Sequence, residues 1–193
     1  MSVRTPDPDP NWKPEDEGAP QVNPSWLGDD ELASIRLRLP LLYVEAVPVR
    51  VDGLGKVTEV GLLLRATPTG SMTRSLVSGR VMYGETLRDA LFRHLEKDLG
   101  PMAFPQLPAS PVPFQVAEYF PLPGITQYTD DRQHAVSLAY VVPVTGTCDP
   151  RQDALEVTWF TPDEVVSDAV CGEMEGGRGA LVKAAVAAMG LFR

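Results

Sequence analysis

The chain has 193 residues, of which 44% are hydrophobic and 22% are charged. That length corresponds to one ordinary domain, and the composition excludes wholesale disorder and a fibrous or collagen-like state. Seventeen Lys and Arg residues stand against 26 Asp and Glu residues, which gives a net charge of -9. Because this charge repels polyanions, nucleic acid is a poor candidate partner.

The cysteines and the N-terminal sequence bear on the compartment. Cys148 and Cys171 have neither the density of a disulfide scaffold nor the spacing of a zinc ribbon. The N-terminal sequence is acidic and proline-rich, whereas a secretion signal begins with basic residues and continues with an apolar run. The most apolar stretches are short and carry charges or prolines, so none is expected to span a membrane. We therefore expect a cytoplasmic protein without a membrane partner.

Residues 1–24 are predicted to form an extended N-terminal arm, and residues 25–193 a single domain. The first thirty residues hold six prolines and seven acidic residues. Proline lacks the backbone donor that a helix or central strand needs, and like charges favour extension. Trp12 and Trp26 carry large apolar surfaces, so we expect them to pack on the domain or on a second copy of the chain.

After the arm, the sequence predicts a short helix and a β-hairpin. Asp29 or Asp30 can cap a helix that ends near Leu39, because a proline follows at position 40. Residues 41–51 and 57–64 are rich in Val, Leu and Tyr, and the residues between them include Asp and Gly. This pattern predicts two strands joined by a turn.

The clearest helix is predicted over residues 85–99, after a short strand or loop at residues 75–81. Thr86 begins a pattern similar to a capping box, and leucines recur every four residues after it. Gly100 and Pro101 then supply a left-handed cap and a stop. The helix therefore has a start, an apolar face and an end that are all visible in the sequence.

The remaining sequence predicts three strands, at residues 114–120, 135–144 and 155–160, and then two helices. A short helix begins at Asp163, and an alanine-rich helix with an apolar face occupies residues 178–191. Four glycines before that last helix are interpreted as a flexible connector. No internal repeat is visible. The element order predicts an α+β fold in which helices cover a mixed or antiparallel sheet.

Residues 79–101, written GRVMYGETLRDALFRHLEKDLGP, carry the most informative pattern. They resemble the signature box of the Nudix hydrolase superfamily: Gly, five residues, Glu, seven residues, then Arg-Glu-apolar-x-Glu-Glu-x-Gly-apolar. Residues 157–165 also resemble the late strand and short acidic helix of that superfamily. The box residues that match are Gly79, Glu85, Arg93, Leu95 and Gly100.

This resemblance implies a fold and an activity. The fold is an α/β/α sandwich around a mixed β-sheet, with the N-terminal arm outside it. The activity is hydrolysis of a nucleoside diphosphate that is linked to another group, with Mg²⁺ or Mn²⁺ as the cofactor. Many members of the superfamily are dimers, so a homodimer is also expected.

Three departures from the box predict that this activity is weak or altered. The glutamates that bind metal in the superfamily fall on His94, Lys97 and Asp98, of which only the last is acidic. Positions i, i+3 and i+4 share one face of a helix, so the geometry of the site is retained. Its charge changes from about -3 to about zero, which removes most of the Coulombic attraction for a divalent ion.

Two functional interpretations follow. If the chain is an active enzyme, the resemblance assigns a weak metal to Asp98 and Glu85, with Asp98, His94 and a loop acid such as Asp131 in catalytic roles. Alternatively, the chain needs no cofactor and is a non-catalytic Nudix-like module that binds a nucleotide-like anion or a protein partner. Glu85 more often pairs with Arg93 in the superfamily, although Asp89 is another candidate partner for that arginine.

The region around the box is basic although the chain is acidic. Residues 65–97 contain six Lys or Arg residues and three Asp or Glu residues, a net charge of +3. We hypothesise that these fixed cations replace the charge of the metal and bind a small phosphorylated ligand. The alternative is that they are solvated partners of surface acids. The residues expected to contact the ligand are Gly79, Arg80, Arg93 and Lys97.

Overall fold

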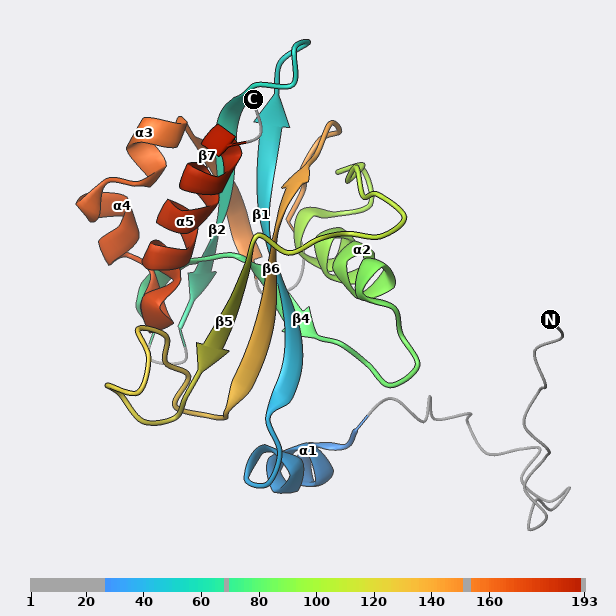
Figure 1. Cartoon of the computed structure of the whole chain (residues 1–193), viewed down its shortest axis with the longest axis vertical. Coiled ribbons are helices and arrows are strands. Elements are labelled where there is room, and N and C mark those ends of the chain that lie inside the picture. The colour runs from blue at the N-terminus through green and yellow to red at the C-terminus, as the bar shows by residue number, and fades with distance from the viewer. Residues whose placement is uncertain (1–26, 68–69, 151–153, 192–193) are drawn as a thin grey trace, which may run out of the picture.

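The structure, a computed structural model, describes residues 27–67, 70–150 and 154–191. Its centre is a mixed sheet with helices on both faces (Figure 1), which confirms the predicted α+β sandwich. The whole predicted arm, residues 1–24 with Trp12, and also Trp26 lie outside the described residues. The strands are β1 (Leu41–Val51), β2 (Val57–Ala66), β3 (Met72–Ser75), β4 (Val77–Arg80), β5 (Gln115–Tyr119), β6 (Ala135–Pro143) and β7 (Ala154–Phe160).

The helices divide between the two faces of the sheet. Helix α2 (Leu87–Leu99) covers one face, and α5 (Arg178–Leu191) covers the other (Figure 1). Beside α5 lie the short helices α3 (Pro162–Val165) and α4 (Asp168–Gly172). In the part of the chain that is described, no helix is long and apolar enough to cross a membrane.

Strand β1 is the centre of the sheet. It pairs in parallel with β6 from Leu41 opposite Ala135 to Val49 opposite Pro143. Its other edge is shared by two antiparallel strands, β4 along its first half and β2 near its end. Strand β2 also pairs with β3 and β7, which lie on its two opposite edges, and β5 pairs with β6.

The two faces of β1 contribute to two separate cores. Val47 and Val49 belong to the core beneath α5, whereas Val44 and Ala46 belong to the core beneath α2. A strand that is buried on both faces has no polar side to present to water. This explains why the sequence LLYVEAVPVRV is almost continuously apolar.

Helix α2 has the caps that the sequence predicts. The Thr86 hydroxyl accepts a hydrogen bond from the backbone N–H of Asp89 at 3.1 Å, and Gly100 ends the helix with a φ of 87°. The helix begins at Leu87 rather than at residue 85 because Thr86 has extended backbone angles. Glu85 therefore belongs to the preceding loop.

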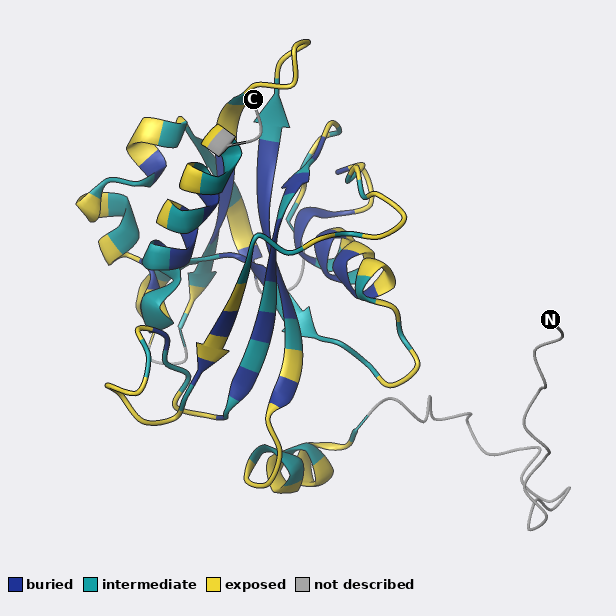
Figure 2. Cartoon of the chain, viewed as in Figure 1, coloured by how far each residue is buried: buried dark blue, intermediate teal, exposed yellow. Residues whose placement is uncertain are grey.

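Helix α1 (Asp29–Arg36) differs from its prediction in how it begins. Its N-cap is Gly28, not Asp29 or Asp30, and no side chain caps it. None of its residues is buried, and it lies below the sheet, outside both cores (Figure 2). It is held by polar contacts such as the hydrogen bond from Arg36 Nε to Gln133 Oε1 at 2.9 Å.

The segment before α5 is also different from the predicted flexible connector. Gly176 and Gly177 have φ angles of 68° and 82°. A Cβ atom at these positions would lie 2.6 Å from the Thr129 carbonyl oxygen and 2.2 Å from the Gln127 carbonyl oxygen. The glycines therefore allow this turn to pack tightly on the loop between β5 and β6.

One carboxylate is buried in the middle of β1. Glu45 is 1% exposed, and its two oxygens accept hydrogen bonds from Tyr119 Oη and Arg178 Nε, each at 2.8 Å. The Arg178 guanidinium also lies 4.8 Å from the centroid of the Tyr119 ring. Burial and the neighbouring carboxylate raise the pKa of Tyr119, so its hydroxyl remains a donor. This cluster joins β1, β5 and α5.

We predict that Arg178→Met destabilises the protein by about 3–5 kcal/mol, because it leaves the Glu45 carboxylate buried without its counter-ion. Urea unfolding at pH 7 measures the loss. The double variant Glu45→Gln with Arg178→Met should lose less stability, since no charge remains buried. An equal or larger loss in the double variant would contradict this account.

Candidate functional site

The loop that enters α2 is held by an ion pair within the box. Arg93 donates to both oxygens of Glu85, from Nε and Nη2, at 2.7 Å each. Nη2 also donates to the Arg80 carbonyl oxygen at 3.0 Å, and the Met82 backbone N–H donates to Glu85. The hydrogen bonds from Arg93 lower the pKa of Glu85 despite its partial burial. No bond links Arg93 to Asp89, which instead accepts from the Thr86 hydroxyl.

His94 lies inside the protein, against the end of strand β4. It is 6% exposed, and its Nε2 lies 3.0 Å from the Arg80 carbonyl oxygen. A carbonyl only accepts, so Nε2 carries the proton, and Nδ1 has no hydrogen-bond partner among the described residues. A Cβ atom at Gly79 would lie 1.8 Å from the ring, which explains why glycine occupies that position.

Asp98 is completely buried and lies between two bases. Arg65 Nη2 and Lys97 Nζ each lie 2.9 Å from one of its oxygens. Neither contact has hydrogen-bond geometry, so the bases act on the carboxylate mainly as charges. Arg65 comes from β2, and no pattern in the sequence indicates that it reaches Asp98. Only the pairing of β2 with its neighbours brings the two positions together.

The loop acids before β6 have local partners. Asp130 forms two hydrogen bonds with the Arg132 guanidinium, at 2.9 and 3.0 Å, and accepts a third from Gln133. Burial acts to raise its pKa, but these donors outweigh burial and lower it. Asp131 is exposed, and within the described chain no hydrogen bond or ion pair joins it to the box.

Comparison with known proteins identifies the family of the chain. A family profile described as "Domain of unknown function (DUF4916)" matches residues 22–191, so the chain belongs to that family. A structure from Jonesia denitrificans DSM 20603, described as a possible asymmetric diadenosine tetraphosphate (Ap4A) hydrolase, is 63% identical. The alignment covers 79% of this chain and 96% of that one, with a TM-score of 0.77. The chain is a member of the Nudix hydrolase superfamily.

More distant Nudix structures share the fold alone. A Nudix hydrolase from Nitrosomonas europaea is 14% identical, with a TM-score of 0.58 over 78% of this chain and 91% of its own. The Nudix domain of Shewanella oneidensis NrtR, complexed with ADP-ribose, is 16% identical, with a TM-score of 0.55 over 77% and 87% of the two chains. No curated protein matches the sequence.

The acids of this Nudix box do not fit a magnesium or manganese site. Nudix hydrolases generally use these ions, which prefer several oxygen ligands. Here Glu85 is bound to Arg93, and Asp98 lies between Arg65 and Lys97. Within the residues that the structure describes, no group of three or more His, Cys, Asp or Glu side chains is placed to hold a metal.

The basic region around the box is only partly free to bind an anion. Arg74 pairs with Glu173 at 2.6 Å, on the face of the sheet that α5 covers, and Arg93 pairs with Glu85. Arg80 and Arg88 have no ion pair in the described parts of the chain; the first is half-buried and the second exposed. Arg74 and Arg93 are therefore partners of acids, whereas Arg80 and Arg88 remain candidates for binding an anion.

We predict that Gly79→Ala destabilises the protein by about 1–3 kcal/mol, because the new methyl group overlaps the His94 ring. Thermal and urea unfolding measure the loss. In a His94→Ala background the same substitution should cost much less, since the ring is gone. If the two effects simply add, the contact is not the reason for glycine at this position.

We also predict a pH dependence that originates at His94. Burial is the largest cause of its lowered pKa, so the folded state binds this proton less readily than the unfolded state, whose histidine titrates near 6.5. The free energy of unfolding should therefore fall as the pH decreases below about 6.5. His94→Gln should lose less stability between pH 7 and 5 in urea unfolding. Parallel curves would show that His94 is not the source.

Proposed function

We propose that this Nudix protein binds a nucleoside polyphosphate beside its box through fixed cations, and that its metal-dependent hydrolysis is weak or absent. The observation that carries the proposal is the placement of Asp98 between Arg65 and Lys97. The remaining acid of the metal-binding face is thereby already neutralised. What the superfamily obtains from a divalent ion would come here from side chains.

The charge around Asp98 supports anion binding. One carboxylate faces two cations, so the group formed by Arg65, Asp98 and Lys97 carries a net charge of about +1. Lys97 is still about one-quarter exposed, with a side-chain accessibility of 27%. Arg80, at the end of β4, adds a half-buried guanidinium group. Its backbone carbonyl group contacts His94 and Arg93. A phosphate at this surface would meet cations fixed by β2, β4 and α2.

A second candidate function is active hydrolysis, and the 63% identical relative supports it. That protein is described as a possible asymmetric Ap4A hydrolase, which makes dinucleoside polyphosphates the first substrate class to test for this chain. For hydrolysis, Glu85 and Asp98 would have to separate from their Arg and Lys partners and bind a metal when substrate binds. In our proposal, these Arg and Lys side chains stay paired with the two acids when the ligand binds.

The proposal predicts that ADP-ribose or Ap4A binds in titration calorimetry with EDTA present. Lys97→Gln and Arg80→Gln should each weaken that binding about tenfold or more, because each removes a charged hydrogen-bond donor to phosphate. Arg74→Gln is the matched control, since it removes an arginine of the same basic region that pairs with Glu173 on the opposite face of the sheet. Binding only in the presence of Mg²⁺ or Mn²⁺ would refute the proposal.

A cleavage assay with Mg²⁺ separates the two functions. Wild-type protein should show little Mg²⁺-dependent release of product from Ap4A, whereas rapid turnover would favour the hydrolase. The double variant His94→Glu with Lys97→Glu should bind Mg²⁺ and gain cleavage, because it restores the acidic face. If the folded double variant stays inactive on a broad set of nucleoside diphosphate derivatives, the lost acids are not the cause of low activity.

A further inference from the structure

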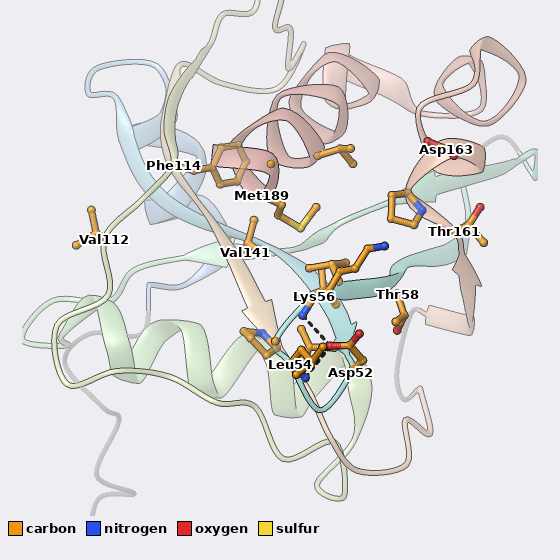
Figure 3. A pocket seen from close by; sticks show the side chains of 18 of the residues that line it. Asp52, Leu54, Lys56, Thr58, Val112, Phe114, Val141, Thr161, Asp163 and Met189 are labelled. Carbon is orange, nitrogen blue, oxygen red and sulfur yellow. Dashed lines mark hydrogen bonds between the residues drawn. The ribbon is translucent and has the colours of Figure 1, made fainter. Parts of the chain in front are cut away.

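A cavity of about 1320 Å³ lies at the end of the sheet next to the hairpin between β1 and β2. Its floor is formed by side chains of the sheet, and its walls come from Phe114 and from Met189 of α5 (Figure 3). In Figure 3 the Met189 side chain points toward the space above Val141. The floor residues are Val49, Val51, Val57 and Val141.

The cavity is separate from the Nudix box. Val49 and Val141 pack with the core beneath α5, whereas the box helix α2 covers the other face of the sheet. Gly79 and Arg80 of the box pair with β1 at Val44 and Tyr43, and the cavity begins at Val49. No box residue lines the cavity. A molecule bound there would not touch the proposed phosphate site.

The lining of the cavity indicates what it can hold. Val49 is completely buried below it, and the half-buried Phe114 and Met189 offer a ring and a flexible thioether to an apolar surface. The volume exceeds the 300–1,000 Å³ that is usual for ligand pockets, so a drug-sized molecule fits. An apolar body is therefore the part of a ligand that this space favours.

The polar rim indicates the charge of such a ligand. Lys56 and the acids Asp52 and Asp163 border the cavity. One oxygen of Asp52 accepts the backbone N–H groups of Leu54 and Lys56, at 2.9 Å each, so the turn already uses part of that carboxylate (Figure 3). The rim carries a net charge of about -1, which disfavours an anion, and the apolar floor disfavours any charged group.

We propose that this cavity is a second ligand site, and that it takes a small, uncharged, largely apolar molecule with a ring. The ring lies on the valine floor between Phe114 and Met189, and polar substituents reach the rim at Lys56. The site is independent of the anion at the box, so both ligands bind at once.

The neutral fluorophore N-phenyl-1-naphthylamine is the probe for this site. Wild-type protein should increase its fluorescence in a saturable titration, and Met189→Trp should weaken the binding at least about tenfold because the indole fills the cavity. Met72→Trp is the matched control: it places the same side chain at an exposed position of β3 that does not line the cavity. The anionic probe 1-anilinonaphthalene-8-sulfonate should bind more weakly than the neutral one.

Methyl NMR locates the probe. The methyl signal of Met189 should shift on titration, whereas those of Met72 and Met102 should not. Addition of ADP-ribose should leave the probe bound, so this test does not depend on the function of the box. The proposal is refuted if wild-type protein does not bind the probe, as when another segment or a second copy fills the cavity. It is also refuted if Met189→Trp binds like wild-type protein, if the anionic probe binds more tightly, or if ADP-ribose displaces the probe.

Discussion

The charge of Glu45 in the middle of the central strand is the constraint around which the fold is organised. A carboxylate without partners at that depth would be strongly destabilising, so burial of the strand requires Tyr119 and Arg178 to be placed beside it. Tyr119 comes from β5 and Arg178 from the first residue of α5. The tight turn at Gly176 and Gly177 brings α5 to the required place. One buried charge therefore specifies how three distant segments meet.

The acids of the box also need counter-charges, but in this chain the counter-charges come from other residues than in the rest of the superfamily. In the superfamily, acids that are placed close together are compatible because a divalent ion neutralises them. In this chain Arg93 neutralises Glu85, while Arg65 and Lys97 neutralise Asp98. In the structure, cationic side chains of the chain itself thus face both of these acids of the box. Such a balance favours a stable scaffold and, in our proposal, a surface that receives phosphate.

Local patterns in the sequence predicted most of the fold, and long-range contacts account for what they missed. The caps of α2 and the apolar run of β1 depend on neighbouring residues, so they are visible in the sequence. The contact of Arg65 with Asp98 depends on how β2 is placed, and no pattern shows it. The candidate roles of Asp131 and His94 came from family resemblance. In the structure, Asp131 is exposed in a loop and His94 is buried. Spacing in the sequence alone does not distinguish an exposed position from a buried one.

The close approach of Gly79 and His94 also constrains how this sequence can evolve. While the imidazole occupies the space above β4, every residue that has a Cβ atom is destabilising at position 79. The ring must be lost before the glycine can change, whereas the reverse order passes through a destabilised intermediate. A change at position 79 therefore depends on which residue is present at position 94. Among relatives of this chain, a side chain at the first position should be found only where the second is no longer histidine.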